Sequence, residues 1–343
     1  MKKGFTLIEL LSVIIILAII LVIAVPQILK VMETSRDNAY KNQEQLLTKA
    51  AKVFVSSNSQ ILPTEIGDSV IVELSEMQNN NLIGEIKDKK QQSIVCDGYV
   101  LIRFIESLKY DYIPYLKCED NYMSKSIIKD GLVLDMPLGD HISGNLYLDR
   151  SGFDRNGTNY GSSFIQNRFD ENDKASSFDG ISNYVNVGNV GTFDEYSFSV
   201  WINPNDIIGS GENASFGFTI AATSSLYGLW LLQTQGEIKF FAFSGSTSIF
   251  GITSGVGIEA GNWYNISVTA KRNGTAKIYV NGEEKLSFNA SSHAWGGNLT
   301  IADLRPGREI FYNGKMSDIR LYNRILSHGE IRHNYEIEKN KSI

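Results

Sequence analysis

The sequence predicts an α+β module, made of a long N-terminal helix and a small antiparallel sheet, followed by an all-β sandwich. An apolar run from Phe5 to Val25 continues into apolar positions at helical spacing. Near residue 123 the chain changes to Gly-, Ser- and Asn-rich segments with alternating hydrophobic residues. At 343 residues, 43% hydrophobic and 20% charged, the chain is long enough for two domains with separate cores.

Charge and cysteine content narrow the classes of partner and compartment. The formal net charge is −6, and an acidic chain is a poor general binder of phosphate, so nucleic acid is not an expected partner. Cys96 and Cys118 are the only cysteines, without Cys-x-x-Cys or His/Cys metal spacing. If the chain is exported, a disulfide between them is expected rather than two free thiols.

The segment Phe5–Val25 is long enough to span a bilayer as a helix, and Lys2 and Lys3 before it predict a cytoplasmic N-terminus. A secretory signal peptide or a simple anchor are the alternatives. However, no Ala-x-Ala-type cleavage site follows the run, and Glu9 lies inside it. An ionised carboxylate is costly there unless it gains a partner, which indicates a segment that packs against a copy of itself.

The run Lys2-Lys3-Gly4-Phe5-Thr6-Leu7-Ile8-Glu9-Leu10 resembles the leader of type IV pilins and type II secretion pseudopilins. The resemblance implies that a prepilin peptidase cuts after Gly4, that Phe5 is N-methylated, and that Glu9 pairs with the N-terminal amine of a neighbouring subunit. It also implies other pilin subunits and an inner-membrane assembly platform as partners. The expected location is the cytoplasmic membrane before assembly, with the N-terminus inside, and a surface pilus afterwards.

One helix is expected from Phe5 to Val55, because Pro26 permits a kink without ending the pattern. Its expected apolar face beyond the membrane consists of Ala39, Leu46, Leu47, Ala50, Val53 and Phe54. In the head, the short apolar run Val70–Leu74 leads into a polar stretch, and Ile94–Ile102 predicts a strand, a turn at Asp97-Gly98 and another strand. A further strand over Tyr110–Leu116 would complete a pilin head, stapled by the disulfide.

The second region consists of short β-like runs separated by turns, with hairpin signals at Asn273-Gly274 and Asn281-Gly282. About 200 residues of this kind suit a jelly roll. From about Gly131 to Tyr335 the ordered segments resemble the concanavalin A-like, laminin G-like jelly-roll family. These segments are Leu148–Gly152, Asn156-Gly157, Phe178–Val185, Phe198–Ile202, Trp263–Thr269, Lys277–Gly282, Gly314–Ser327 and a terminal helix containing Glu330 and Ile331.

The expected domain boundaries follow from these segments. They are a leader at 1–4, the membrane and assembly half of the helix at 5–25, the helix continuation and head at 26–123, a linker at 124–130, the jelly roll at 131–338 and a tail at 339–343.

The jelly roll by itself does not define an activity, since it hosts lectins, adhesive modules, spacers and some glycosidases. An enzyme is not expected. The Glu-x-Asp-x-x-Glu strand of one glycosidase group is absent, with Ser176 following Glu171 and Asp173 where the second Glu would fall. The four histidines form no metalloprotease helix and no obvious triad.

Ligand candidates are residues near Gly- and Ser-rich turns that offer an aromatic face or a planar polar group: Tyr227, Trp230, His293, Trp295, Arg305 and Arg308. Trp201 and Trp263 are expected in the core, whereas Trp295 is the tryptophan most expected to be exposed. A structural Ca²⁺ is a further expectation, with Asp149, Asp179 and Asp318 as ligands. The alternative is that Asp149 and Asp179 cap turns and Asp318 pairs with Arg320 or Arg324.

The sequence thus favours a modular minor pilin that displays a lectin-like module for adhesion to glycans or matrix proteins. The alternative is a structural pilin or pseudopilin whose jelly roll binds only other filament components. An exposed aromatic-lined groove would favour the first hypothesis, and a large flat apolar patch the second.

Overall fold

The computed structural model divides the chain into two compact units. The first comprises residues 1–62, 71–102 and 111–124, and the second comprises residues 63–70, 103–110 and 125–343. The residues that the structure describes are 7–65, 68–106, 109–119, 122–124, 126–139, 141–142, 145–206, 218–223, 227–232, 237–244, 247–252, 256–290, 294–303 and 311–340.

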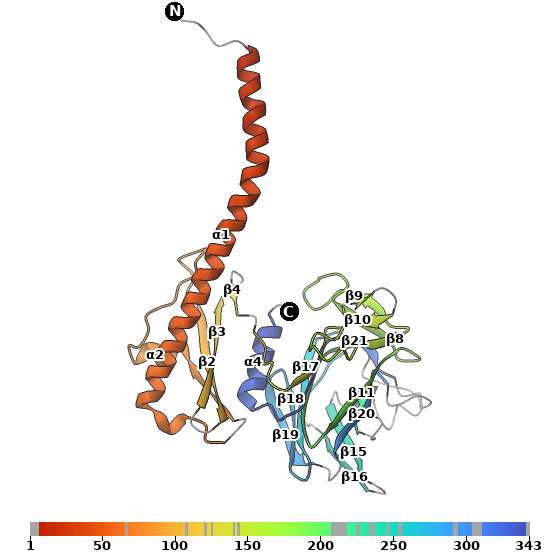
Figure 1. Ribbon diagram of the computed structural model, residues 1–343. Coiled ribbons are helices and arrows are strands. Elements are labelled where there is room, and N and C mark those ends of the chain that lie inside the picture. The colour runs from red at the N-terminus through yellow and green to blue at the C-terminus, as the bar shows by residue number, and fades with distance from the viewer. Residues whose placement is uncertain are drawn as a thin grey trace, which may run out of the picture. The chain divides into compact units, whose positions relative to one another are not determined.

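The first unit is built on one long helix, α1 (Leu7–Ser57), which continues through Pro26 (Figure 1). This confirms the predicted single helix over its described length. Leu47 and Ala50 are buried as expected, but Leu46 and Val53 are 55% and 51% exposed. They lie on the row of the helix beside the buried stripe, so the predicted apolar face was too wide.

Within the described residues, no helix combines the length and the hydropathy required of a membrane span. The span expected at 5–25 stays a prediction from the sequence.

A sheet in the order β1-β2-β3-β4 accompanies α1. Asp97-Gly98, predicted as a turn, instead begins β2. The reason is a close backbone approach: a Cβ on Gly98 would lie 2.4 Å from the carbonyl oxygen of Tyr115 in β3. The elements after α1 are η1 (Ser59–Ile61), β1 (Ser69–Glu73), α2 (Leu74–Asn79), β2 (Asp97–Glu106), β3 (Lys109–Cys118) and β4 (Tyr122–Met123).

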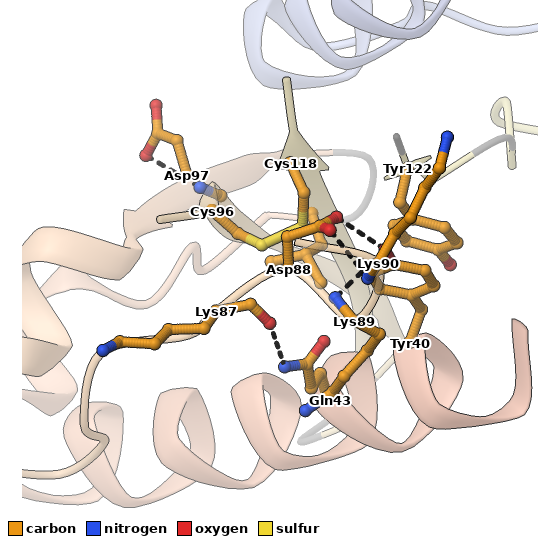
Figure 2. Close-up of a disulfide and its surroundings, with 12 residues drawn as sticks. Tyr40, Gln43, Lys87, Asp88, Lys89, Lys90, Cys96, Asp97, Cys118 and Tyr122 are labelled. Carbon is orange, nitrogen blue, oxygen red and sulfur yellow. Dashed lines mark hydrogen bonds between the residues drawn. A yellow bond between two sulfur atoms is a disulfide. The ribbon is translucent and has the colours of Figure 1, made fainter. Parts of the chain in front are cut away.

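The predicted disulfide between Cys96 and Cys118 is present, and both residues are buried. Figure 2 shows its surroundings, including a loop held against α1 by the buried carboxylate of Asp88. Asp88 accepts hydrogen bonds from Tyr40 Oη on α1 at 2.6 Å and from the backbone N–H of Lys90 at 2.7 Å. The disulfide and this carboxylate therefore hold the long segment between α2 and β2 in place.

Replacing Cys96 and Cys118 with serine is expected to destabilise the first unit by about 3 kcal/mol, because the bond restricts a loop of this length in the unfolded chain. The two cysteines are 22 residues apart. Hydrogen exchange of peptides from β2 and β3 in urea would measure the loss. Reductant should lower the hydrogen-exchange protection of the wild type to that of the variant, and should leave the protection of the variant unchanged. Equal protection of the variant and the oxidised wild type would contradict the prediction.

The second unit contains two antiparallel sheets, as Figure 1 shows. Among the described residues, the first sheet has the order β19 (Glu283–Asn289), β18 (Thr275–Val280), β17 (Tyr264–Lys271), β12 (Glu195–Pro204), β21 (Asn313–Tyr322), β10 (Ala175–Asp179) and β9 (Ser163–Ile165), with β5 (Leu132–Met136) also paired to β21. The second has the order β16 (Thr247–Ile252), β15 (Glu237–Ser244), β14 (Tyr227–Leu232), β13 (Phe218–Thr223), β20 (Trp295–Ile301), β11 (Tyr184–Phe193), β8 (Gly157–Tyr160), β7 (Leu146–Tyr147) and β6 (His141–Ile142).

Alternate side chains of the two sheets form one shared hydrophobic core, as in a jelly roll. Phe198, Val200 and Ile202 of β12 contribute from one sheet, and Val185 and Val187 of β11 from the other. Both predicted Asn-Gly turns are confirmed: they connect β17 to β18 and β18 to β19. Because sheet order, core and turns agree, the predicted all-β sandwich is confirmed.

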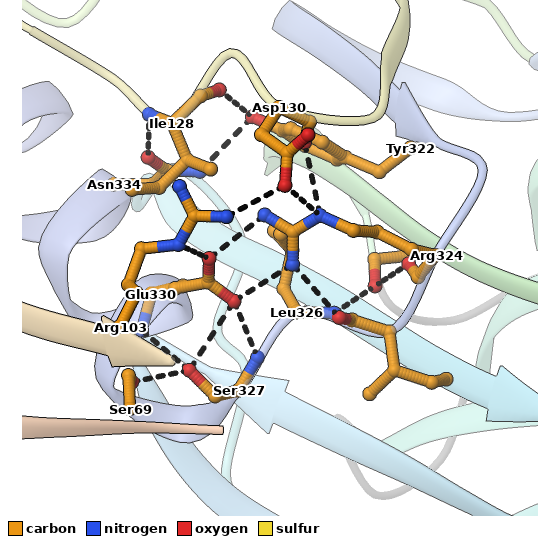
Figure 3. Close-up of polar contacts among 12 residues, drawn as sticks. Ser69, Arg103, Ile128, Asp130, Tyr322, Arg324, Leu326, Ser327, Glu330 and Asn334 are labelled. Atoms are coloured by element: carbon orange, nitrogen blue, oxygen red, sulfur yellow. Dashed lines mark hydrogen bonds and ion pairs between the residues drawn. The ribbon is translucent and has the colours of Figure 1, made fainter. Parts of the chain in front are cut away.

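The predicted terminal helix is α4 (His328–Glu338), which begins with a capping box between Ser327 and Glu330. Glu330 is fully buried and lies 2.7 Å from Arg103 Nε and 2.7 Å from Arg324 Nη2 (Figure 3). Asp130 pairs with the same two arginines. These charges satisfy one another, so the start of α4 is fixed within the second unit.

His333 makes the stability of α4 dependent on pH. It is fully buried, its Nε2 lies 2.8 Å from the carbonyl oxygen of Ser126, and burial lowers its pKa below 6.5 despite nearby Glu330 and Glu336. The unfolded chain therefore takes up a proton near pH 6.5 while the folded chain does not, so the free energy of unfolding falls as the pH drops below that value.

His333→Gln, which retains an N–H donor but cannot titrate, should lose less stability than the wild type between pH 7.5 and 5.5. Urea unfolding at both pH values would measure this difference. An identical pH dependence of the two proteins would contradict the assignment.

Candidate functional site

The side chains of the residues predicted to act in cleavage, methylation and assembly lie outside the described part of the structure. Gly4 and Phe5 lie outside the described residues. Glu9 lies in α1, but its side chain is outside the described part. Their roles stay predictions from the sequence motif.

The predicted ligand residues do not come together as one described site. Tyr227 and Trp230 lie on β14, with side chains outside the described part, and His293, Arg305 and Arg308 lie outside the described residues. The expectation that Trp295 is exposed is wrong: it is 6% exposed and stacks on Tyr196, with ring centroids 4.5 Å apart. Its neighbour Gly296 allows a close approach to Gly191 rather than an open turn.

The three aspartates considered for Ca²⁺ are committed to separate protein partners. Asp149 accepts from the backbone N–H groups of Asp135, Ser151 and Arg155. Asp179 caps its turn by accepting three backbone N–H groups at 2.9–3.0 Å. Asp318 pairs with Arg168 at 2.7 Å.

These commitments do not fit a Ca²⁺ site shared by the three carboxylates. Across the described ranges, no group of three or more His, Cys, Asp or Glu side chains could hold a metal ion. Calcium binding by this chain stays a prediction, which thermal unfolding of the purified protein with and without EDTA would test.

A pocket of about 380 Å³ in the second unit combines aromatic and planar polar side chains. Its aromatic lining is Phe169, Trp201, Trp263 and Tyr335, and its polar lining is Arg168, Asn281, Lys339 and Asn340. The core position expected for Trp263 is therefore wrong, because this residue precedes the first residue of β17 and is only partly buried. The site gathers a loop, a strand, a hairpin turn and the end of α4.

Local chain geometry explains how the hairpin turn and α4 meet at this pocket. Asn281 and Gly282 have φ values of 53° and 78°, which a tight turn requires and glycine adopts without strain. A Cβ on Gly282 would lie 2.8 Å from Tyr335 Cδ1. The missing side chain thus allows the Tyr335 ring of α4 to pack directly on the turn.

Trp201 and Arg168 form the buried floor of the pocket. Trp201 is 4% exposed, and the Arg168 guanidinium lies 4.1 Å from the centroid of its ring. Arg168 donates to Asp318 Oδ2 at 2.7 Å and, through Nη2, to the backbone carbonyl oxygen of Glu338 at 2.9 Å. Arg168 therefore joins the loop that carries it to β21 and to α4.

Below the floor lies a buried charge network, defined here as Arg168, Asp318, Arg320, Glu338 and Asp135. The Glu338 carboxylate pairs with Arg320 and accepts the Trp201 Nε1–H, while Arg320 Nε lies 2.9 Å from Asp135. Burial opposes ionisation of Asp318, but the guanidinium groups of Arg168 and Arg320 outweigh it and lower the pKa of Asp318. Burial raises the pKa of Glu338, against the opposing charge of Arg320.

Sequence reasoning missed most of this pocket. Arg168 and Phe169 follow β9 in a polar loop, and Lys339 and Asn340 follow the last residue of α4 in a segment predicted as a tail. The signal that was present is Asn281-Gly282, which marks a hairpin tip but says nothing of what packs on it.

Comparison with known proteins gives two family matches. Residues 1–25 match the model for the prokaryotic N-terminal methylation motif. Residues 179–332 match the model for the concanavalin A-like lectin/glucanases superfamily. Among curated proteins, none matches the chain.

Similar solved structures include two binding domains and one domain of an arabinanase. The binding domain of Paraclostridial Mosquitocidal Protein 1 is 16% identical with a TM-score of 0.48, covering 60% of this chain and 52% of that one. Domain 4 of an extracellular arabinanase from Geobacillus stearothermophilus, solved with arabinotriose, is 15% identical with a TM-score of 0.45, covering 60% and 98%. The ligand-binding domain of botulinum neurotoxin serotype D, solved with N-acetylneuraminic acid, is 17% identical with a TM-score of 0.47, covering 62% and 52%.

The chain spans about half the length of the first and third of these structures. The sheet order, the shared core and the two family matches agree with one another. The chain therefore carries a prepilin-type methylation motif at residues 1–25 and a concanavalin A-like jelly-roll domain in its second unit.

Proposed function

We propose that the chain is a pilin-type filament subunit whose jelly roll binds carbohydrate in the pocket between Trp263 and Tyr335. The pocket carries this proposal, because it joins partly buried aromatic rings to planar polar groups in one hollow of about 380 Å³. The apolar C–H face of a sugar ring packs on an aromatic ring, while amide and guanidinium groups reach hydroxyl groups at the ring edge.

The filament part of the proposal is supported by the motif at residues 1–25 and by the surface of α1. The helix exposes apolar side chains from Leu7 to Met32, and again at Leu46 and Val53. Exposed apolar surface of this extent is costly in water and suits burial against lipid and then against other subunits. In this proposal the chain is held in the cytoplasmic membrane after synthesis and reaches the cell surface in a pilus.

A binding role without hydrolysis is also proposed. Glycoside hydrolysis commonly uses two carboxyl groups placed on either side of the scissile bond. The described residues that line the pocket contribute aromatic, amide and cationic groups but no carboxylate. Incubation of the full chain with the oligosaccharides that it binds should therefore leave them intact, as chromatography of the mixture would show.

Trp263→Ala is expected to weaken glycan binding at least tenfold, because it removes the most accessible tryptophan of the pocket. A glycan array followed by calorimetry on the full chain in detergent would measure the loss. Phe153→Ala is the matched control, since Phe153 is 55% exposed and does not line the pocket.

The alternative function is a structural subunit whose jelly roll contacts only other filament proteins. It predicts that the wild type binds no glycan and that Trp263→Ala changes neither binding nor the yield of pili. Glycan binding that is lost in Trp263→Ala and retained in Phe153→Ala would exclude this alternative.

A further inference from the structure

The polar groups that face the pocket are mainly hydrogen-bond donors. Asn281 Oδ1 already accepts the backbone N–H of Asn265 at 2.9 Å, so the amide presents its NH₂ group. In the described part of the chain, neither Asn281 Nδ2 nor Trp263 Nε1 has a hydrogen-bond partner. Because an indole N–H and an amide NH₂ group can only donate, both groups are available to an acceptor on a ligand.

The charged groups of the pocket are also of one sign. Arg168 and Lys339 are cationic, and the described lining includes no carboxylate. The Arg168 side chain is 5% exposed and paired with Asp318, which partly neutralises its positive charge. Lys339 is the accessible cation, with its side chain 34% exposed.

Lys339 is held at the pocket edge without being locked. Its Nζ lies 5.2 Å from the centroid of the Tyr335 ring and 2.7 Å from Glu336 Oε1. An exposed pair of this kind contributes about 0–1 kcal/mol, so a ligand carboxylate can compete for the ammonium group. The Tyr335 ring keeps that group near the aromatic wall on which a sugar would lie.

We propose that the pocket selects a carboxylated saccharide, with the sugar ring on Trp263 and the carboxylate bound by Lys339. This inference rests on the proposed carbohydrate-binding function and adds its ligand class. A carboxylate offers only hydrogen-bond acceptors. It therefore suits the ammonium group of Lys339 and the N–H donors of Asn281 and Trp263 at once. A neutral saccharide brings hydroxyl groups that also donate, and gains nothing from the positive charge.

The test compares acids with their own methyl esters, which keep the shape of the sugar and remove its charge. The probes are oligosaccharides that contain glucuronate, galacturonate or N-acetylneuraminate, each as the acid and the ester, with neutral oligosaccharides alongside. Binding to the full chain in detergent is measured by calorimetry at low and high salt. At least one acid should bind at least tenfold more tightly than its ester, and added salt should reduce the difference.

Lys339→Gln should remove the preference for the acid, so that each acid and its own ester bind with equal affinity. Lys271→Gln is the matched control, because Lys271 is also an exposed, ion-paired lysine but lies outside the pocket. Equal binding of acids and esters, or an acid preference that survives Lys339→Gln, would overturn the inference.

The two proposals fail differently. If neutral sugars bind, Trp263→Ala abolishes that binding and acids gain nothing, then the ligand class is wrong and the carbohydrate site stands. If no saccharide of either kind binds, then the proposed function itself is wrong.

Discussion

Replacing Glu338 with alanine is expected to lower the free energy of unfolding of the second unit by about 3–5 kcal/mol. The Arg320 side chain is 2% exposed and, among the described residues, would retain Asp135 as its one remaining direct ion-pair partner. The Trp201 Nε1–H would lose its acceptor as well. A buried charge that has lost one of its partners and an unmade hydrogen bond both cost far more than the original pair contributes, so a third or more of a typical domain's stability of about 5–15 kcal/mol is at stake.

Tryptophan fluorescence makes this measurement specific to the second unit, since all four tryptophans lie between residues 201 and 295. Urea unfolding of the full chain, followed by this fluorescence, would give the change in the free energy of unfolding. Glu336→Ala is the control on the same helix, because Glu336 pairs at the surface with Lys339 and should cost less than about 1 kcal/mol. A loss for Glu338→Ala as small as that of the control would show that the network is not required for stability.

The same network explains what the sequence could not predict about the site. Arg168 and Glu338 are 170 residues apart, and they meet because both reach β21, where Arg168 pairs with Asp318 and Glu338 pairs with Arg320. Alternation and turn signals describe residues that are close in sequence. They therefore located β17, β18 and the hairpin turn after each of them correctly, but could not place one distant charge beside another.

The two tryptophan errors have the same origin. Trp263 is expected in the core from the sequence, yet β17 begins one residue later and the Trp263 side chain lines the pocket. Trp295 was predicted to be exposed because two glycines follow it. A Cβ on Gly296 would lie 2.0 Å from the carbonyl oxygen of Gly191, so that glycine reflects close strand packing beside a buried ring. Composition around a residue does not show which side of a sheet it faces.

Glycine also misled the prediction of the head, where Gly98 looked like a turn and lies in a strand. By contrast, the long helix, the disulfide, the jelly roll and the prepilin motif could all be predicted. The helix, the jelly roll and the motif extend a regular pattern over many residues, and the disulfide follows from having two cysteines in a chain expected to be exported. Isolated residues are ambiguous because one residue type serves several backbone conformations.

Glu9→Ala is expected to leave the protein membrane-inserted and cleaved but to reduce its incorporation into pili at least tenfold. Glu9 lies in an otherwise apolar run, where a carboxylate is costly until it pairs with a positive group. In the proposed assembly that group is the amine of Phe5 on a neighbouring subunit, created when the leader is removed. Losing the carboxylate would leave this amine without its partner, and a tenfold effect corresponds to about 1.4 kcal/mol.

Glu33→Ala is the matched control, because it makes the same chemical change at an exposed position of α1 beyond the apolar run. Membrane fractionation, mass spectrometry of the N-terminus and quantification of sheared pili would separate insertion, cleavage and assembly. If Glu9→Ala fails to insert, Glu9 acts before assembly; if it assembles normally, the carboxylate has no pairing role. If Glu9→Ala reduces the yield of sheared pili but not insertion or cleavage, and Glu33→Ala changes none of them, then Glu9 acts when the chain leaves the bilayer for the filament. That step would bring the jelly-roll pocket to the cell surface.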